Sequence, residues 1–165
     1  MIASPASMIR VNQAGEYGAR RIYEGQLAVL GRTPLAPLLE HMKEQELAHL
    51  ERFNEQLVRH KVRPTLLQPL WHVAGYALGV ATGLLGERAA MACTVAVEDV
   101  IDQHYDAQLD LLGSSAPELS DLIAACQLEE REHRDIASEH SSPYPILSHA
   151  ITAASRLAIW CSTRI

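Results

Sequence analysis

The sequence predicts an all-α protein that folds as an antiparallel helix bundle. Proline and glycine divide its 165 residues into six blocks of helical length. Apolar residues recur in four of these blocks at steps of three and four, which is the spacing of one helix face. No stretch shows the alternation of a β-strand between hairpin turns. We therefore expect one domain covering residues 1–165.

The positions of the breaker residues set the limits of the six expected helices. The segments run over about residues 11–30, 35–60, 70–86, 87–112, 115–140 and 144–165, with the fifth starting at Ser115 or Pro117. The third and sixth segments lack the charged core face of the other four. We expect them to be additional helices beside a four-helix bundle.

Charge and cysteine content narrow the possible functions. A net charge of -6 and a pI near 5.7 argue against nucleic-acid binding, because proteins of that class present a basic face. The cysteines Cys93, Cys126 and Cys161 are widely spaced within apolar stretches. We interpret them as reduced core thiols rather than a disulfide framework.

Charged side chains interrupt the apolar face of four segments. The first and fourth carry one Glu each, and the second and fifth carry a Glu followed by a His three residues later. These residues are Glu16, Glu98, Glu46 with His49, and Glu130 with His133. Carboxylates are almost never buried unless they are paired or bound to a metal. Six such residues on inward faces need a common explanation.

The same residues form an internal repeat. Twice in the chain a lone Glu precedes a Glu-x-x-His motif by about 30 positions. Residues at i and i+3 share a helix face and can bind one metal together. Two lone Glu residues with two Glu-x-x-His motifs are the ligand set of ferritin-like di-metal carboxylate bundles. Four carboxylates and two imidazoles, without a thiolate, favour iron or manganese over structural zinc.

The residue pattern leaves three classes of function open. The first is an enzyme that uses dioxygen, and the second is another use of two irons, such as iron storage or peroxide reduction. The third is a helical bundle that binds a lipid or a protein partner without any metal. A single Glu-x-x-His is more often an exposed charged face, but that explanation does not account for the repeat.

Several stretches resemble the 5-demethoxyubiquinone hydroxylase family over almost the whole chain. They are IRVNQAGEYGA at 9–19, RIY at 21–23, VLGRT at 29–33, RPT at 63–65, PLW at 69–71, MACTVAVE at 91–98 and HY at 104–105. The resemblance implies a ferritin-like di-iron monooxygenase of ubiquinone biosynthesis. Such an enzyme hydroxylates the ring of 2-polyprenyl-3-methyl-6-methoxy-1,4-benzoquinol with dioxygen.

The resemblance also implies a cofactor, a reductant and a location. The two irons would be bound by Glu16, Glu46, His49, Glu98, Glu130 and His133. NADH is the possible reductant, although the sequence has no G-x-G-x-x-G fingerprint of a dinucleotide-binding fold. The protein would be a homo-oligomer, associated with other ubiquinone-biosynthesis proteins. It would be peripheral on the inner membrane, on the cytoplasmic face in a bacterium or the matrix face in a mitochondrion.

Four further residues near the ligand positions are candidates for supporting roles. Tyr105 and His104 could relay electrons or protons between the quinone and the irons, or they could be structural. Asp102 and Glu129 could orient the metal-binding histidines, since such histidines usually donate their second N–H to a carboxylate or carbonyl. Glu129 could equally be a solvated surface residue.

The segment 64–86 contains no Asp, Glu, Lys or Arg. Its length reaches that of a membrane span, ~18 residues, but two prolines and several small or polar residues lower its hydropathy. Gly75, Gly79 and Gly83 fall on one closely packing face. We consider an interfacial helix, a buried or oligomer-facing helix, and a spanning helix, and favour the first. The segment 144–165 is expected to join the same membrane surface.

Overall fold

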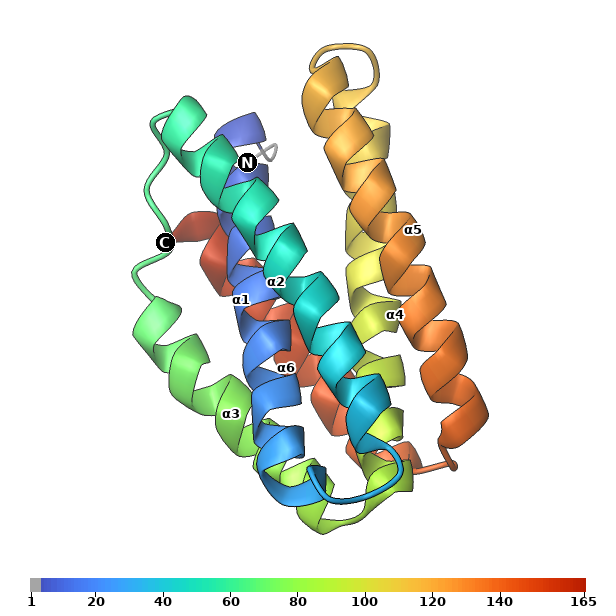
Figure 1. Ribbon diagram of the computed structural model, residues 1–165. Helices are drawn as coiled ribbons and strands as arrows, with labels where there is room; N and C mark the ends of the chain where they lie inside the picture. Colours follow the sequence, from blue (N-terminus) through green and yellow to red (C-terminus); the bar gives the residue numbers. More distant parts are fainter. Residues whose placement is uncertain (1–3) are drawn as a thin grey trace.

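Residues 4–165, the part of the chain described by this computed structural model, form six α-helices and no β-strand (Figure 1). They are α1 (Pro5–Leu30), α2 (Ala36–Arg59), α3 (Gln68–Leu84), α4 (Glu87–Leu112), α5 (Pro117–His140) and α6 (Pro145–Arg164). The predicted ferritin-like bundle with two additional helices is confirmed.

The helix ends follow the predicted breaker residues closely, except at the start of α1. This helix begins at Pro5 and not near Val11, because Ser4 caps it: the Ser4 hydroxyl accepts a hydrogen bond from the Ser7 amide at 3.2 Å. Pro5 occupies the first helical position, where its missing N–H costs nothing. At the turns around α4, Gly86 and Gly113 adopt φ values of 103° and 49°, which other residues rarely adopt.

The four long helices pair as two hairpins, α1 with α2 and α4 with α5, while α3 and α6 pack against α1 and α4 (Figure 1). Two apolar clusters fill the bundle on either side of its centre. One contains Met8, Phe53 and Tyr105, and the other contains Met42 and Met91. The charged core positions lie between these clusters, so water is excluded from both directions along the bundle.

Glycines allow α3 to lie unusually close to α1. A Cβ atom at Gly79 would lie 2.0 Å from the carbonyl oxygen of Ile22, and one at Gly25 would lie 2.2 Å from that of Tyr76. The predicted close-packing face of α3 is therefore confirmed, with α1 as its partner. The outer face remains exposed, with Val73 64% accessible. None of the helices described here combines the length and the hydropathy needed to cross a bilayer.

Candidate metal centre

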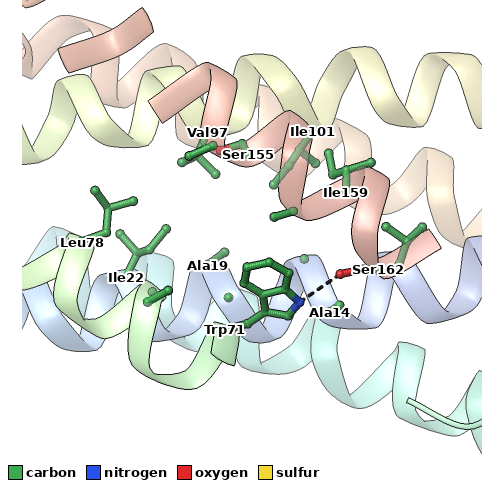
Figure 2. Close-up of a pocket in the computed structure, with 17 residues that line it drawn as sticks. Ala14, Ala19, Ile22, Trp71, Leu78, Val97, Ile101, Ser155, Ile159 and Ser162 are labelled. Carbon is green, nitrogen blue, oxygen red and sulfur yellow. Dashed lines mark hydrogen bonds between the residues drawn. The ribbon is translucent and has the colours of Figure 1, made fainter. Parts of the chain in front are cut away.

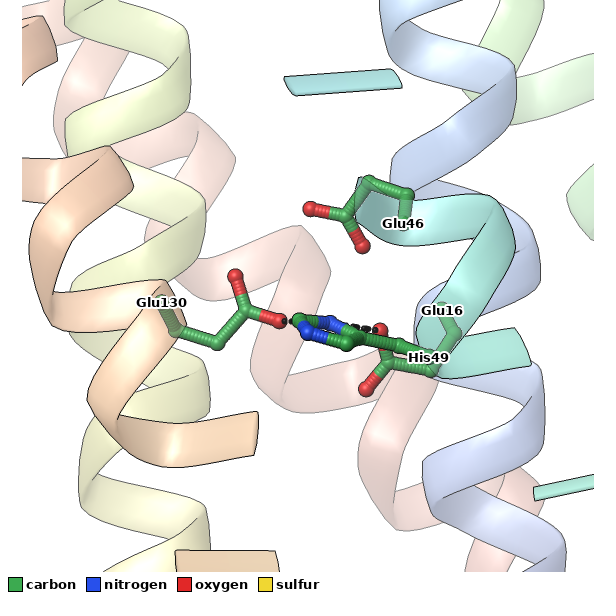
Figure 3. Close-up of side chains that lie close together, drawn as sticks. All are labelled: Glu16, Glu46, His49 and Glu130. Atoms are coloured by element: carbon green, nitrogen blue, oxygen red, sulfur yellow. Dashed lines mark hydrogen bonds and ion pairs between the residues drawn. The ribbon is translucent and has the colours of Figure 1, made fainter. Parts of the chain in front are cut away.

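All six predicted metal-site residues meet at the centre of the bundle, and Figure 3 shows four of them. None is more than 2% exposed. The six are Glu16, Glu46, His49, Glu98, Glu130 and His133. The sequence repeat therefore identified a set of residues that the fold brings together, and their role as metal ligands stays a prediction.

Each helix of the bundle contributes to the cluster in the way the helical spacing requires. Glu16 comes from α1 and Glu98 from α4, whereas α2 and α5 each supply a Glu-x-x-His. Within each of these motifs the Glu and the His are one turn apart and point to the same side. Two hairpins thus bring equivalent halves of one site together.

The six residues divide into two groups that share two carboxylates. Each group offers four ligand atoms within 4.8 Å of one another. The first group is Glu16, Glu46, His49 and Glu130, and the second is Glu46, Glu98, Glu130 and His133. Glu46 and Glu130 belong to both groups, so their carboxylates lie between the two halves of the cluster.

Glu130 lies between the two imidazole rings. Its Oε1 is 3.0 Å from Nδ1 of His49, and its Oε2 is 3.2 Å from Nδ1 of His133 (Figure 3 shows the first). Nδ1 of His49 also lies 3.2 Å from Oε2 of Glu16. Both histidines therefore turn Nδ1 towards the cluster and Nε2 away from it.

Burial and mutual repulsion control the protonation of the carboxyl groups. Burial raises the pKa of Glu46 and Glu98 well above 4.5, and the negative charge of Glu130 adds to the increase. Burial would also raise the pKa of Glu130, but hydrogen bonds from His133 and His49 lower it to about 2. Burial opposes charge on the two histidines, yet their contacts with Glu130 raise the pKa of both. Without a metal, the cluster therefore retains protons in its centre.

The outward nitrogens of the two histidines have different partners. Nε2 of His49 is 3.0 Å from Oε2 of Glu129, and Nε2 of His133 is 2.9 Å from Oε1 of Gln45. The expectation that Glu129 orients a histidine is confirmed in its geometry. Gln45 was missed, although it directly precedes Glu46 as Glu129 precedes Glu130.

The expectation for Asp102 is wrong. Its carboxylate accepts hydrogen bonds from Arg131 Nε at 2.7 Å and from Arg134 at 3.0 Å, which join α4 to α5 away from both histidines. Helical position alone placed Asp102 one turn from Glu98, but the guanidinium groups of α5 are the closer and stronger partners.

Two tyrosines hold the lone carboxylates from the opposite hairpin. The hydroxyl of Tyr105 on α4 donates to Glu16 on α1, and that of Tyr23 on α1 donates to Glu98 on α4 at 3.4 Å. The sequence motifs assigned no role at the site to Tyr23. The sequence does contain a pattern that predicts this pairing, because each tyrosine follows a lone Glu by two helical turns. The relay role of Tyr105 stays a prediction.

His104 lies beside the cluster in a second polar group. Its Nε2 is 2.7 Å from Nε2 of Gln108. The Gln108 amide also forms two hydrogen bonds with Asn12: its Nε2 donates to Oδ1 at 2.9 Å, and its Oε1 accepts from Nδ2 at 2.8 Å. Burial lowers the pKa of His104 to about 4. The ring is therefore neutral at physiological pH, and its predicted relay role is not tested by this geometry.

The donor set fits a pair of divalent cations. Among residues 4–165, Oε2 of Glu46 and Oε2 of Glu98 are buried without a hydrogen-bond partner, and Oε1 of Glu46 has no hydrogen bond but lies 3.3 Å from Nδ1 of His133. Buried carboxylate oxygens that lack a partner cost free energy, and metal coordination removes that cost. The two ligand types, carboxylate and imidazole, are also ones that iron and manganese accept.

The fold and the paired groups of carboxylates and histidines resemble those of ferritin-like bundles, a class in which such residues hold two metal ions. Comparison with known proteins then specifies the family. A model described as "Ubiquinone biosynthesis protein COQ7" matches residues 3–162. This chain belongs to that family.

Named relatives cover nearly all of the chain. The 3-demethoxyubiquinol 3-hydroxylase of Rhodospirillum rubrum is 52% identical, over 98% of this chain and 81% of its own length. The human mitochondrial NADPH-dependent 3-demethoxyubiquinone 3-hydroxylase is 49% identical, over 96% of this chain and 76% of its own. The mitochondrial 5-demethoxyubiquinone hydroxylase of Saccharomyces cerevisiae is 42% identical, over 96% of this chain and 77% of its own length. The family resemblance expected from the sequence motifs is confirmed.

The metal-free protein should become less stable as the pH rises from about 5 to about 8. The folded-state pKa values of Glu46, Glu98, His49 and His133 all lie above their unfolded values. In that window the native state therefore holds more protons than the unfolded state, and its stability falls with pH. The opposite shift of Glu130 acts only below its unfolded pKa of 4.5, outside the window. His104, whose pKa burial lowers from 6.5 to about 4, opposes the trend below about pH 6.5, but one group against four leaves the direction unchanged.

Urea unfolding of chelator-treated protein across this pH range checks the prediction. The variant Glu46→Gln, Glu98→Gln carries neutral side chains of the same shape and should show a shallower decline. A metal-free protein whose stability is constant or increases with pH would contradict the electrostatic description of the cluster.

Proposed function

We propose that this chain is a non-haem di-iron monooxygenase that hydroxylates the ring of 5-demethoxyubiquinol in ubiquinone biosynthesis. The observation that carries the proposal is the cluster of four carboxylates and two histidines, nearly inaccessible to solvent. It occurs in a chain whose named relatives are demethoxyubiquinol and demethoxyubiquinone hydroxylases. A quinol substrate supplies the ring, and dioxygen supplies the new hydroxyl oxygen.

The two groups in the cluster suggest how iron would be held. Glu16 with His49 would bind one iron and Glu98 with His133 the other. Glu46 and Glu130 would contact both, since they belong to both groups. The chemistry that two bound irons supply is the reductive activation of dioxygen, for which six protein ligands leave coordination positions open.

The protein's own residues position this centre and keep it dry. The hydroxyls of Tyr105 and Tyr23 hold the carboxylates of Glu16 and Glu98. We further propose that Tyr105, with neutral His104 beside it, passes protons or electrons between the quinol and the centre. The reductant we propose is a nicotinamide nucleotide, because the names of several relatives specify NADPH; the NADH expected from the resemblance stays a prediction.

An apolar pocket of about 170 Å³ lies between α1, α3, α4 and α6 (Figure 2). Gly15 and Val97, which line it, are the sequence neighbours of Glu16 and Glu98. The pocket thus flanks the same turns of α1 and α4 that hold the cluster. Near one end a hydrogen bond of 3.0 Å joins the Trp71 indole to Ser162, which fixes α3 against α6. We propose that this pocket takes the apolar part of the substrate, the start of its polyprenyl tail.

The outer surfaces of α3 and α6 are suited to a lipid surface. Large apolar side chains are exposed on these helices and at the two ends of α3: Leu66, Leu70, Val73, Leu84, Leu85, Ile146, Leu157 and Trp160. Arg164 stacks on Trp160 at 4.1 Å, where its charge can meet a lipid phosphate. We propose that residues 64–86 and 144–165 dock peripherally on the inner membrane and admit the tail from the bilayer. This would be the cytoplasmic face in a bacterium or the matrix face in a mitochondrion. Self-association and contacts with other biosynthetic proteins are further parts of this proposal.

Glu98→Ala should abolish ubiquinone production and lower the iron content of the protein. Loss of a residue that merely orients a metal ligand lowers metal affinity or activity by about 10- to 100-fold. Loss of a ligand itself should therefore lower turnover by at least about 100-fold. The measurement is ubiquinone content in a strain that accumulates the demethoxy precursor, together with iron per purified chain. Asp99→Ala is the matched control, since Asp99 is the next residue and its side chain is 51% exposed. Turnover retained in Glu98→Ala, or an iron-loaded wild type that restores no ubiquinone, would contradict the proposal.

Gly18→Leu should raise KM for a long-tailed quinol by about 10-fold or more, because a leucine side chain would occupy the pocket. No atom lies within 4 Å of a Cβ built at Gly18, so Gly18→Ala should fold normally, and the circular dichroism spectrum of Gly18→Leu should match that of Gly18→Ala. Gly18→Ala should give a smaller increase, and a substrate analogue without the tail should be affected little. Equal KM changes for tailed and tailless substrates would show that the pocket does not hold the tail.

Val73→Glu should weaken sedimentation of the protein with phospholipid vesicles, since it places a charge on the outer face of α3. Val58→Glu is the matched control, because Val58 is a similarly exposed valine, 80% accessible, on α2. If both variants sediment with vesicles like the wild type, the α3 surface does not bind the membrane.

A further inference from the structure

The two halves of the cluster are related by an approximate repeat that extends beyond the six central residues. Each lone Glu accepts a hydrogen bond from a tyrosine of the other hairpin. Each Glu-x-x-His is preceded by a residue that reaches the histidine of the other hairpin. The lone Glu, the tyrosine and the Glu-x-x-His are the same in both halves. The residue before the Glu-x-x-His differs: it is Gln45 in one half and Glu129 in the other.

This one difference places a charge on one side of the centre. Oε2 of Glu129 lies 3.0 Å from Nε2 of His49, and its Oε1 lies 3.3 Å from a guanidinium nitrogen of Arg52. On the other side, Oε1 of the neutral amide Gln45 lies 2.9 Å from Nε2 of His133. Glu129 is about one-third exposed and Arg52 is similarly accessible, so water screens the charge only in part.

The orientation of the rings fixes what these partners do. Both histidines turn Nδ1 towards the shared carboxylates. A metal bound at Nδ1 requires its lone pair, so the ring proton sits on Nε2 and is donated outward. A carboxylate accepts that proton more strongly than an amide does, which makes the imidazole a better electron donor to its metal.

We infer that Glu129 and Gln45 are positioning residues that make the two metal positions electronically inequivalent. The metal beside His49 has the stronger imidazole donor, so its reduction potential is lower than that of the metal beside His133. Gln45 holds His133 in place without adding charge. The inference rests on the metal centre put forward under Proposed function. Arg52 anchors the carboxylate of Glu129 in the orientation that His49 needs.

Redox titration of the iron-loaded protein tests this inference. In wild type, the two one-electron reductions should be separated, with the lower potential belonging to the His49 side. Glu129→Gln keeps a hydrogen-bond acceptor and removes the charge, so the lower potential should rise and the gap should narrow. Gln45→Glu should lower the higher potential and also narrow the gap. The double exchange should restore a gap close to that of wild type.

The matched control is Glu132→Gln, which removes the same charge from an exposed position on the same helix. Titration with Co²⁺, which needs no redox change, gives an independent readout: Glu129→Ala should weaken one of two sites by about 10- to 100-fold. A wild type that binds fewer than two ions per chain would overturn the metal centre and this inference with it. If wild type binds two ions but Glu129→Gln and Gln45→Glu have the potentials of the control, the inference fails and the metal centre stands.

Discussion

The burial of four carboxylate groups at the centre of one helix bundle is the constraint on which the rest of the structure depends. Glu16, Glu46, Glu98 and Glu130 are at most 2% exposed, and carboxylates in such surroundings are costly unless positive charge compensates them. Two histidines supply part of that charge when protonated. The apolar clusters on either side keep water out, which raises the cost and strengthens every electrostatic interaction at the site. A pair of divalent cations meets this requirement with the residues already in place.

The same constraint explains how the two hairpins are joined. The hydrogen bonds around the site cross from one hairpin to the other: Tyr105 to Glu16, Tyr23 to Glu98, and the histidines to Glu129 and Gln45. Each half therefore orients the ligands of the other half. Hydrogen bonds between the hairpins fix the geometry of these side chains more firmly than contacts within one helix would. They also link folding of the bundle to assembly of the site.

Local pattern predicted most of this arrangement, and long-range packing accounts for what it did not predict. Helical periodicity and the repeat identified the bundle and all six central residues, because helical spacing alone decides which side chains share a face. Asp102 was misassigned because its arginine partners come from α5. The pocket was not predictable, because it depends on how closely Gly79 lets α3 approach α1 and on the Trp71–Ser162 contact. Gln45 and Tyr23 were predictable in principle by extending the repeat outward.

Anomalous diffraction at the iron absorption edge, from crystals of iron-loaded protein, tests the central claim most directly. We expect two iron atoms between α1, α2, α4 and α5, roughly 3.5–4 Å apart as in other two-metal sites. Glu46 and Glu130 should each contact both irons, and Nδ1 of each histidine should contact one. A single iron, or iron bound outside the cluster, would show that these six residues do not form a di-iron centre.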